Sequence, residues 1–201
     1  ECSHPMPDFT NVNNRDRMLK AVKMVGAFEF KAELSWLVKD SKKVFQKFNI
    51  KKPYCVIIPG SSPHKPSKRW SPKKYANLSN SLYELGITSY LAGTKIERNI
   101  AMEVCTYSRA SEILVDKTNL EELAQIFANA QFVVGNDTGP TFLAARTGAP
   151  TLMIMGADTN PYMSSPIGSA AGFIYNADIQ AITTQEVLNK ILELGGLSHL
   201  K

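Results

Sequence analysis

Cysteine and long hydrophobic runs are scarce in this sequence of 201 residues. Its three cysteines, Cys2, Cys55 and Cys105, are an odd number without the spacing of a zinc site. They exclude a disulfide framework and favour a reduced, cytosolic setting with structural thiols. No apolar run approaches the roughly 20 residues that cross a bilayer, so the sequence offers no candidate transmembrane helix.

Signature motifs of several enzyme classes are also absent. Neither G-x-G-x-x-G after a strand nor G-x-x-x-x-G-K-[ST] occurs, which argues against a Rossmann dehydrogenase and a P-loop nucleotidase. No G-x-S-x-G elbow is present. The three histidines, His4, His64 and His199, are scattered and cannot build a metal site without carboxylates. We therefore expect a site with neither metal nor cofactor.

The composition is that of a globular protein with an uneven charge. Hydrophobic residues make up 44% and charged residues 20% of the chain. Residues 1–100 carry 18 basic and 8 acidic side chains, whereas residues 101–201 carry 5 and 10. The basic half either meets an anionic partner or serves solubility. We expect no nucleic acid as partner, because the basic residues are scattered over helix faces with few aromatics between them.

From residue 54 onward, short buried-type strands alternate with amphipathic helices. This rhythm predicts an α/β domain, a doubly wound, Rossmann-like parallel sheet. Ser71 is expected to cap a helix that Pro72 opens. The expected strands are residues 54–58, 87–92, 113–115, 132–134, 151–155 and 173–175, and residues 160–172 are expected to form a loop. The expected helices are residues 15–25, 40–48, 72–85, 97–106, 119–127, 140–147 and 184–194.

The stretch of residues 132–150 organises this pattern, because it predicts a strand, a tight turn and a helix in succession. Ligands of such sheets bind beyond the carboxyl ends of the strands, which places residues 136–139 and 156–160 on the rim. The first helical turn also directs free backbone N–H groups and the positive end of its dipole there. An anion is the expected ligand.

Three sequence features each have two interpretations, a structural one and a ligand-binding one. Asp137 is a cap or Asx-turn residue, a carboxylate that holds sugar hydroxyls while Thr138 and Gly139 offer donors to a phosphate, or both at once. The loop of residues 61–70, with its hydroxyls and basic side chains, either wraps a diphosphate or is solvated. Glu97 is either a helix-start charge or a ligand of ribose hydroxyls, with Gly93 allowing close approach of a nucleotide.

The residues of the central stretch carry a family resemblance. Gly135-Asn-Asp-Thr-Gly-Pro-Thr-Phe-Leu-Ala-Ala145, then Gly-Ala-Pro150, then the turn at residues 156–161, resemble the C-terminal half of bacterial glycosyltransferase family 9, the lipopolysaccharide heptosyltransferases. That family usually has His where Phe142 stands, and often a Gly-Pro-Thr-Asp-Pro-like turn at residues 156–161. The match covers residues 54–165 well and the first 50 residues loosely.

The resemblance implies a GT-B glycosyltransferase. Residues 1–50 would be the end of an N-terminal acceptor domain and the hinge, and residues 51–201 the C-terminal nucleotide-sugar-binding domain. In the family a Lys two residues before Trp-x-Pro contacts the donor phosphates, which matches Lys68, and a Glu at the place of Glu97 holds the ribose. The implied donor-binding residues are Ser61, Ser62, Lys68, Gly93, Glu97, Asp137, Thr138 and Gly139.

The reaction so implied is an inverting, metal-independent transfer of a sugar, heptose, from an ADP-linked donor to a lipopolysaccharide core acceptor at the inner-membrane surface. The expected location is cytoplasmic, with peripheral membrane contact left open. The chain begins at Glu1 without an initiator Met, so we expect a piece of a longer protein. The family's catalytic base lies near the start of its N-terminal domain, and we name no base here. The alternative function is a nucleotide-binding module without transferase activity.

Overall fold

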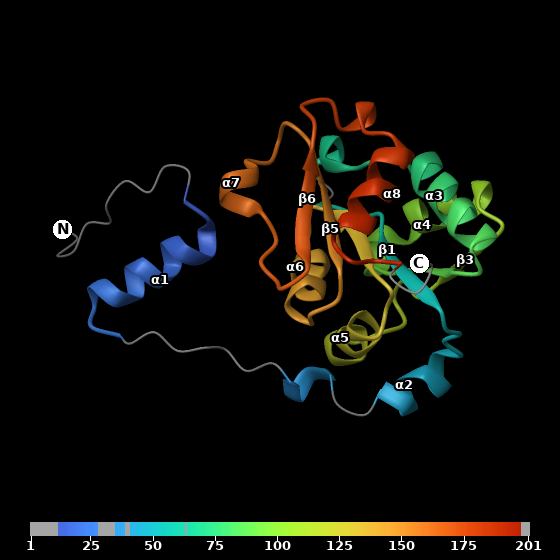
Figure 1. The fold of residues 1–201 in the computed structure, drawn as a ribbon, viewed down its shortest axis with the longest axis horizontal. Coiled ribbons are helices and arrows are strands. Elements are labelled where there is room, and N and C mark those ends of the chain that lie inside the picture. The colour runs from blue at the N-terminus through green and yellow to red at the C-terminus, as the bar shows by residue number, and fades with distance from the viewer. Residues whose placement is uncertain (1–11, 28–34, 39–40, 63, 198–201) are drawn as a thin grey trace.

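A six-stranded, wholly parallel sheet forms the centre of the molecule (Figure 1). The computed structural model describes residues 12–27, 35–38, 41–62 and 64–197. The strands are β1 (Tyr54–Ile58), β2 (Thr88–Leu91), β3 (Ser111–Ile113), β4 (Val133–Asn136), β5 (Thr151–Met155) and β6 (Ala171–Tyr175). Their spatial order is β3-β2-β1-β4-β5-β6. The doubly wound α/β fold expected from the alternating pattern is thus confirmed.

Helices cover both faces of the sheet. The α-helices of the described residues are α1 (Asn14–Met24), α2 (Ser41–Phe48), α3 (Pro72–Glu84), α4 (Arg98–Tyr107), α5 (Leu120–Ala128), α6 (Gly139–Arg146), α7 (Pro161–Ser164) and α8 (Thr184–Glu193). Apolar side chains of α3, α4 and α8 share one core cluster, and those of α2, α5 and α6 share the other. Successive side chains of β1 alternate between them, Cys55 and Ile57 to the first and Val56 and Ile58 to the second.

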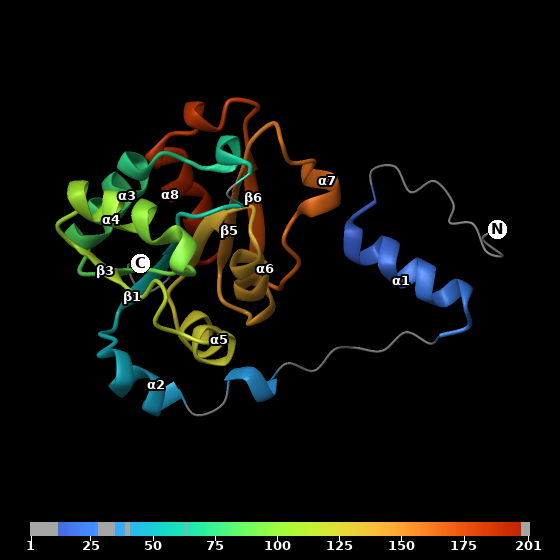
Figure 2. The ribbon, with the colours of Figure 1, turned by 180° about the vertical axis from the view of Figure 1, so that it is seen from behind.

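The helix α1 stands beside this body rather than on the sheet (Figure 2). It contains no buried residue. At its start, the Asn13 side chain accepts from the backbone N–H of Arg15 at 3.0 Å, which caps the helix. The Nδ2 group of Asn13 also donates to the carbonyl oxygen and the hydroxyl of Ser165, each at 3.2 Å. Within the described residues, no helix is long and apolar enough to cross a membrane.

The structure corrects three local expectations. The strand expected at residues 113–115 lies at Ser111–Ile113, because Leu114 and Val115 are buried after the strand has ended and imitate its apolar pattern. The expected loop of residues 160–172 contains the short helix α7, whose start Asn160 caps. Ser71 occupies the cap position of α3, but its side chain makes no capping hydrogen bond there.

Candidate functional site

The strands β1 and β4 lie side by side, and the chain leaves them in opposite directions across the sheet. This is the topological switch point of an open α/β sheet, where the loops beyond the carboxyl ends of the strands separate and leave a crevice. The loop of residues 59–70 follows β1, and Asp137 follows β4. The candidate site is therefore built by these two segments and the start of α6.

Asn136, the last residue of β4, binds the two segments together. Its fully buried side chain donates from Nδ2 to the carbonyl oxygens of Pro59 at 2.8 Å and Gly60 at 3.2 Å. Its Oδ1 accepts from the backbone N–H of Trp70 at 3.0 Å and from the hydroxyl of Tyr75 at 2.9 Å. Burial raises the pKa of Tyr75 well above its usual range, so this hydroxyl remains a donor. Asn136 was expected on the rim, but this role could not be predicted from the sequence.

Asp137 forms the electrostatic centre of the crevice. Its Oδ2 lies 2.5 Å from the Nζ of Lys68, and both side chains are largely buried, with 10% and 15% of their surface exposed. The same oxygen accepts from the hydroxyl of Thr159 at 2.7 Å. Asp137 does not cap α6, because the cap position belongs to Thr138. The capping interpretation was therefore wrong, and the expected placement of residues 156–160 on this rim is supported by Thr159.

The loop after β1 is anchored at several points. The Ser61 hydroxyl is buried, donating to the carbonyl of Lys65 and accepting from Nε of Arg69, both at 3.2 Å. Ser62 is exposed. The hydroxyl of Ser67 donates to the carboxylate of Asp158, in the loop after β5. Of the two predicted serines, the structure leaves Ser62 open to a ligand and engages Ser61 within its own loop.

Glu97 packs against two glycines of the crevice, Gly60 and Gly93. A Cβ added to Gly60 would lie 2.0 Å from the Cγ of Glu97, and a Cβ added to Gly93 would lie 3.0 Å from the Cβ of Glu97. Gly93 therefore makes room for Glu97, where the sequence analysis expected it to make room for a nucleotide. The Oε2 of Glu97 accepts from the backbone N–H of Thr94 at 2.7 Å and from its hydroxyl at 2.6 Å. This capping box is the helix-start role weighed above.

A small cavity joins Glu97 to the start of α6. Its volume is about 60 Å³, and Gly60, Gly93 and Thr138 are among its lining residues. The side chain of Thr138 does not cap α6, and a Cβ built on Gly139 would meet no atom within 4 Å. Pro140 has no N–H, and the N–H of Thr141 donates to the carbonyl of Thr138 at 3.0 Å. Among the contacts described, the N–H of Gly139 is therefore the donor of the first turn that is left for a ligand, together with the positive end of the dipole.

The structure thus brings Lys68, Asp137, Thr138 and Gly139 together on one side of the crevice and Glu97 with Gly93 on the other. Asn136, Thr159 and Ser67 were expected near the site only as members of longer ranges, and their individual contacts were not predicted. Asn and Thr are common in turns, so only their long-range partners distinguish them. Within the described part of the chain, no three His, Cys, Asp or Glu side chains gather as metal ligands.

The fold and this crevice define a class of protein, an open α/β domain with a polar crevice at the switch point of its sheet. Comparison with known proteins narrows the class. A sequence profile of glycosyltransferase family 9 (heptosyltransferase) matches residues 5–193. Lipooligosaccharide heptosyltransferase 2 of Haemophilus influenzae is 30% identical over 129 residues, which are 61% of this chain and 36% of that protein. The chain belongs to glycosyltransferase family 9.

Two solved structures share the fold. The glycosyltransferase of family 9 from Veillonella parvula superposes with a TM-score of 0.78 at 16% identity, over 93% of this chain and 61% of that one. The Escherichia coli heptosyltransferase WaaC with ADP gives a TM-score of 0.71 at 22% identity, over 95% and 59%. These likenesses confirm the Rossmann-like fold of a GT-B glycosyltransferase. The chain spans between about a third and three fifths of the length of these proteins.

We predict that Asn136→Ala destabilises the protein by about 2–4 kcal/mol, because it leaves several buried partners without hydrogen bonds. The midpoint of urea unfolding measures this loss of stability, and the slope of the unfolding free energy against urea concentration should stay unchanged. Asn189→Ala on α8 is the control, since the Asn189 amide is exposed and bonds only locally to Gln185 among the contacts described; its effect should stay within about 0.5 kcal/mol. Equal effects of the two substitutions would contradict the role of Asn136.

Proposed function

We propose that this chain is the nucleotide-sugar-binding part of a heptosyltransferase, which moves heptose from an ADP-linked donor to a lipopolysaccharide core acceptor at the inner-membrane surface. The observation that carries the proposal is the convergence of Lys68, Asp137 and the uncapped start of α6 at the switch point. Family membership supports the transfer of a sugar. The Escherichia coli heptosyltransferase WaaC has been solved with ADP and with ADP-2-deoxy-2-fluoro heptose, which supports the same donor class here.

The donor diphosphate would lie between Lys68 and the amides of Thr138 and Gly139. A Lys ammonium has three N–H donors, so Lys68 can keep its bond to Asp137 and still donate to a phosphate oxygen. The charge of Lys68 is already balanced by Asp137, which leaves the helix start as the additional source of positive potential. These groups stabilise the negative charge that develops on the departing diphosphate. Ser62 adds a hydroxyl at the loop.

Glu97 would hold the ribose. Its Oε2 already accepts two bonds from Thr94, and Oε1 is left to accept from sugar hydroxyls. The bonds to Thr94 fix the carboxylate in one orientation at the cavity of residues 60, 93 and 138. The capping role and the ligand role are thus compatible.

The domain assignment remains part of this proposal, with residues 1–50 belonging to the acceptor side and residues 51–201 to the donor side. The described residues place three carboxylates near the crevice, and each one is bonded: Glu97 to Thr94, Asp137 to Lys68 and Asp158 to Ser67. A general base for the acceptor hydroxyl needs a carboxylate that is free to take the proton. We infer that none of these three carboxylates is the general base of an inverting, metal-independent transfer, and that another residue supplies it.

We expect Lys68→Ala to weaken ADP binding by about 1.5–3 kcal/mol, the range for a hydrogen bond to a charged group. Isothermal titration calorimetry with ADP measures the change. Lys65→Ala is the matched control, because Lys65 lies exposed in the same loop. An affinity that stays the same in the Lys68 variant, with the fold intact by circular dichroism, would remove this lysine from the site.

Glu97→Gln should lower the affinity for ADP more than the affinity for 2′,3′-dideoxy-ADP, since only ADP has the hydroxyls that the carboxylate would bind. The loss for ADP should be about 1.5–3 kcal/mol, again the range for a bond to a charged group. The melting temperature without nucleotide reports the capping role separately, because the bonds of Glu97 to Thr94 at the turn Lys95–Glu97 need no ligand. Equal losses for the two nucleotides would leave Glu97 with the capping role alone.

The second candidate function, binding without transfer, is favoured for the 201-residue chain by the engagement of its three crevice carboxylates. We expect the purified chain to bind ADP but to form no product from ADP-heptose and a core acceptor in a mass-spectrometric assay. General-base assistance is typically worth about 10²–10⁴-fold in rate. A turnover near one per second, in the range of ordinary enzymes, would place a base within these residues and contradict the domain assignment.

A further inference from the structure

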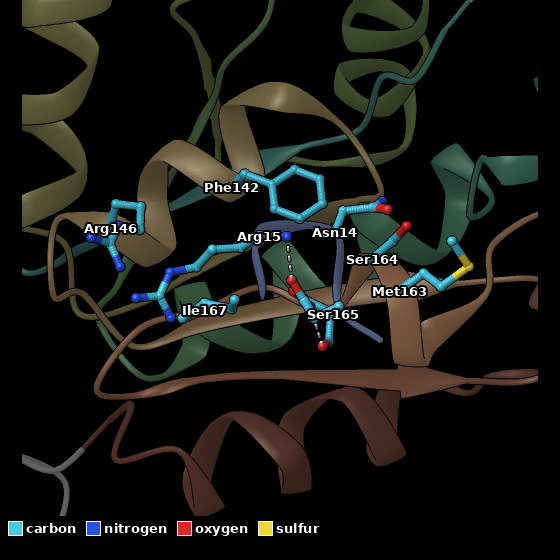
Figure 3. Close-up of a pocket in the computed structure, with 9 residues that line it drawn as sticks. Asn14, Arg15, Phe142, Arg146, Met163, Ser164, Ser165 and Ile167 are labelled. Carbon is cyan, nitrogen blue, oxygen red and sulfur yellow. Dashed lines mark hydrogen bonds between the residues drawn. The ribbon is translucent and has the colours of Figure 1, made fainter. Parts of the chain in front are cut away.

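A larger pocket lies outside the crevice, between the start of α1 and the helices α6 and α7 (Figure 3). Its volume is about 430 Å³, within the range of about 300–1,000 Å³ that is usual for small-molecule sites. The bond between Asn13 and Ser165 closes one side of the pocket. The pocket thus joins two segments that lie far apart in the sequence.

The charge of the pocket lining is positive. Arg15 and Arg146 both line it, and none of the lining residues is acidic. Figure 3 shows the side chain of Arg15 extending toward that of Arg146. The carboxylate paired with Arg15 is that of Asp16, at 3.7 Å, and both partners of this pair are about half exposed. Such a pair is weak in water and is readily exchanged for another anion.

Apolar surface completes the pocket. Phe142, Met163 and Ile167 are lining residues, and the ring of Phe142 lies beside Asn14 and Arg15 in Figure 3. A lining of aromatic and aliphatic side chains with a few polar groups is typical of a site for a small organic ligand. Two guanidinium groups favour a ligand that carries phosphate or carboxylate, which Arg binds with paired N–H donors. Asn14 and Ser164 add groups that can bond hydroxyls.

The helix α6 connects this pocket to the crevice. Its N-cap residue Thr138 and its second residue Pro140 line the small cavity beside Glu97. Phe142 and Arg146 follow at a spacing of four residues, which places them on one face of the helix, about 6 Å apart along its axis. A ligand in the pocket would therefore lie along the same helix whose start faces the donor phosphates.

We propose that this pocket is a subsite for an anionic sugar unit of the acceptor, a ring that bears phosphate or carboxylate, with Arg15 and Arg146 binding the anion and Phe142 packing against the ring. The assignment to the acceptor rests on the function proposed above. The binding of a charged sugar by these three residues is the part that the structure itself motivates.

The test titrates the chain with glucose 6-phosphate, glucuronate and glucose, and follows the Nε–Hε signals of arginine by NMR. We expect both charged sugars to shift the signals of Arg15 and Arg146, and to bind at least about tenfold more tightly than glucose. Arg146→Gln and Arg15→Gln should each lower the affinity for the charged sugars about tenfold. Phe142→Ala should weaken the binding of both charged sugars by a similar factor.

Arg109→Gln is the control, since Arg109 lines a different pocket, beside Asn80 and Tyr107, and it should change none of these affinities. A preference for glucose 6-phosphate or for glucuronate identifies the anionic group, and either preference supports the subsite. Equal affinity for glucose and the charged sugars, or charged-sugar binding unchanged in both arginine variants, would overturn it. ADP added to the same samples tests the proposed function separately, because a chain that binds the charged sugars but not ADP would contradict that function alone.

Discussion

The buried amide of Asn136 is the interaction on which the arrangement of the crevice depends. Its two donors and its acceptor oxygen reach the end of β1, the loop that precedes α3 and α3 itself. Side chains with both donors and acceptors are few, and a carboxylate or an apolar residue could not satisfy all of these partners. Because Lys68 lies two residues before Trp70, the same amide also fixes where the ammonium group can reach.

Trp70 extends this constraint to the segment that precedes α8. Its indole N–H donates to the carbonyl of Ile182 at 2.9 Å, and its ring packs edge-on against Tyr75. Gln180 bonds the backbone on either side of the tryptophan. The loop after β1 is therefore held by the segment that precedes α8 as well as by β4, and a loop so held keeps its polar groups in place without a ligand. Pre-organisation of this kind lowers the conformational entropy that binding would otherwise cost.

Much of the fold could be predicted from sequence, because the signals were local. The apolar run of β5 and the stop at Gly148 and Pro150 needed no knowledge of distant residues. The shift of β3 was missed since Leu114 and Val115 are as apolar as a strand although they lie beyond it. At the site, the family resemblance pointed to Lys68 and Asp137, but their mutual ion pair depends on residues 69 positions apart. The bond of Ser67 to Asp158 and the contact of Glu97 with Gly60 were missed for the same reason.

The contact between Gly60 and Glu97 has an evolutionary consequence. A methyl group at position 60 would overlap the Cγ of Glu97, so the size of one residue limits the size of the other. A relative with Ala at position 60 must either carry a smaller side chain at position 97 or move the turn Lys95–Glu97 away from the sheet. The two positions should therefore vary together among homologues, and a chain that keeps a long acidic side chain at position 97 should keep glycine at position 60.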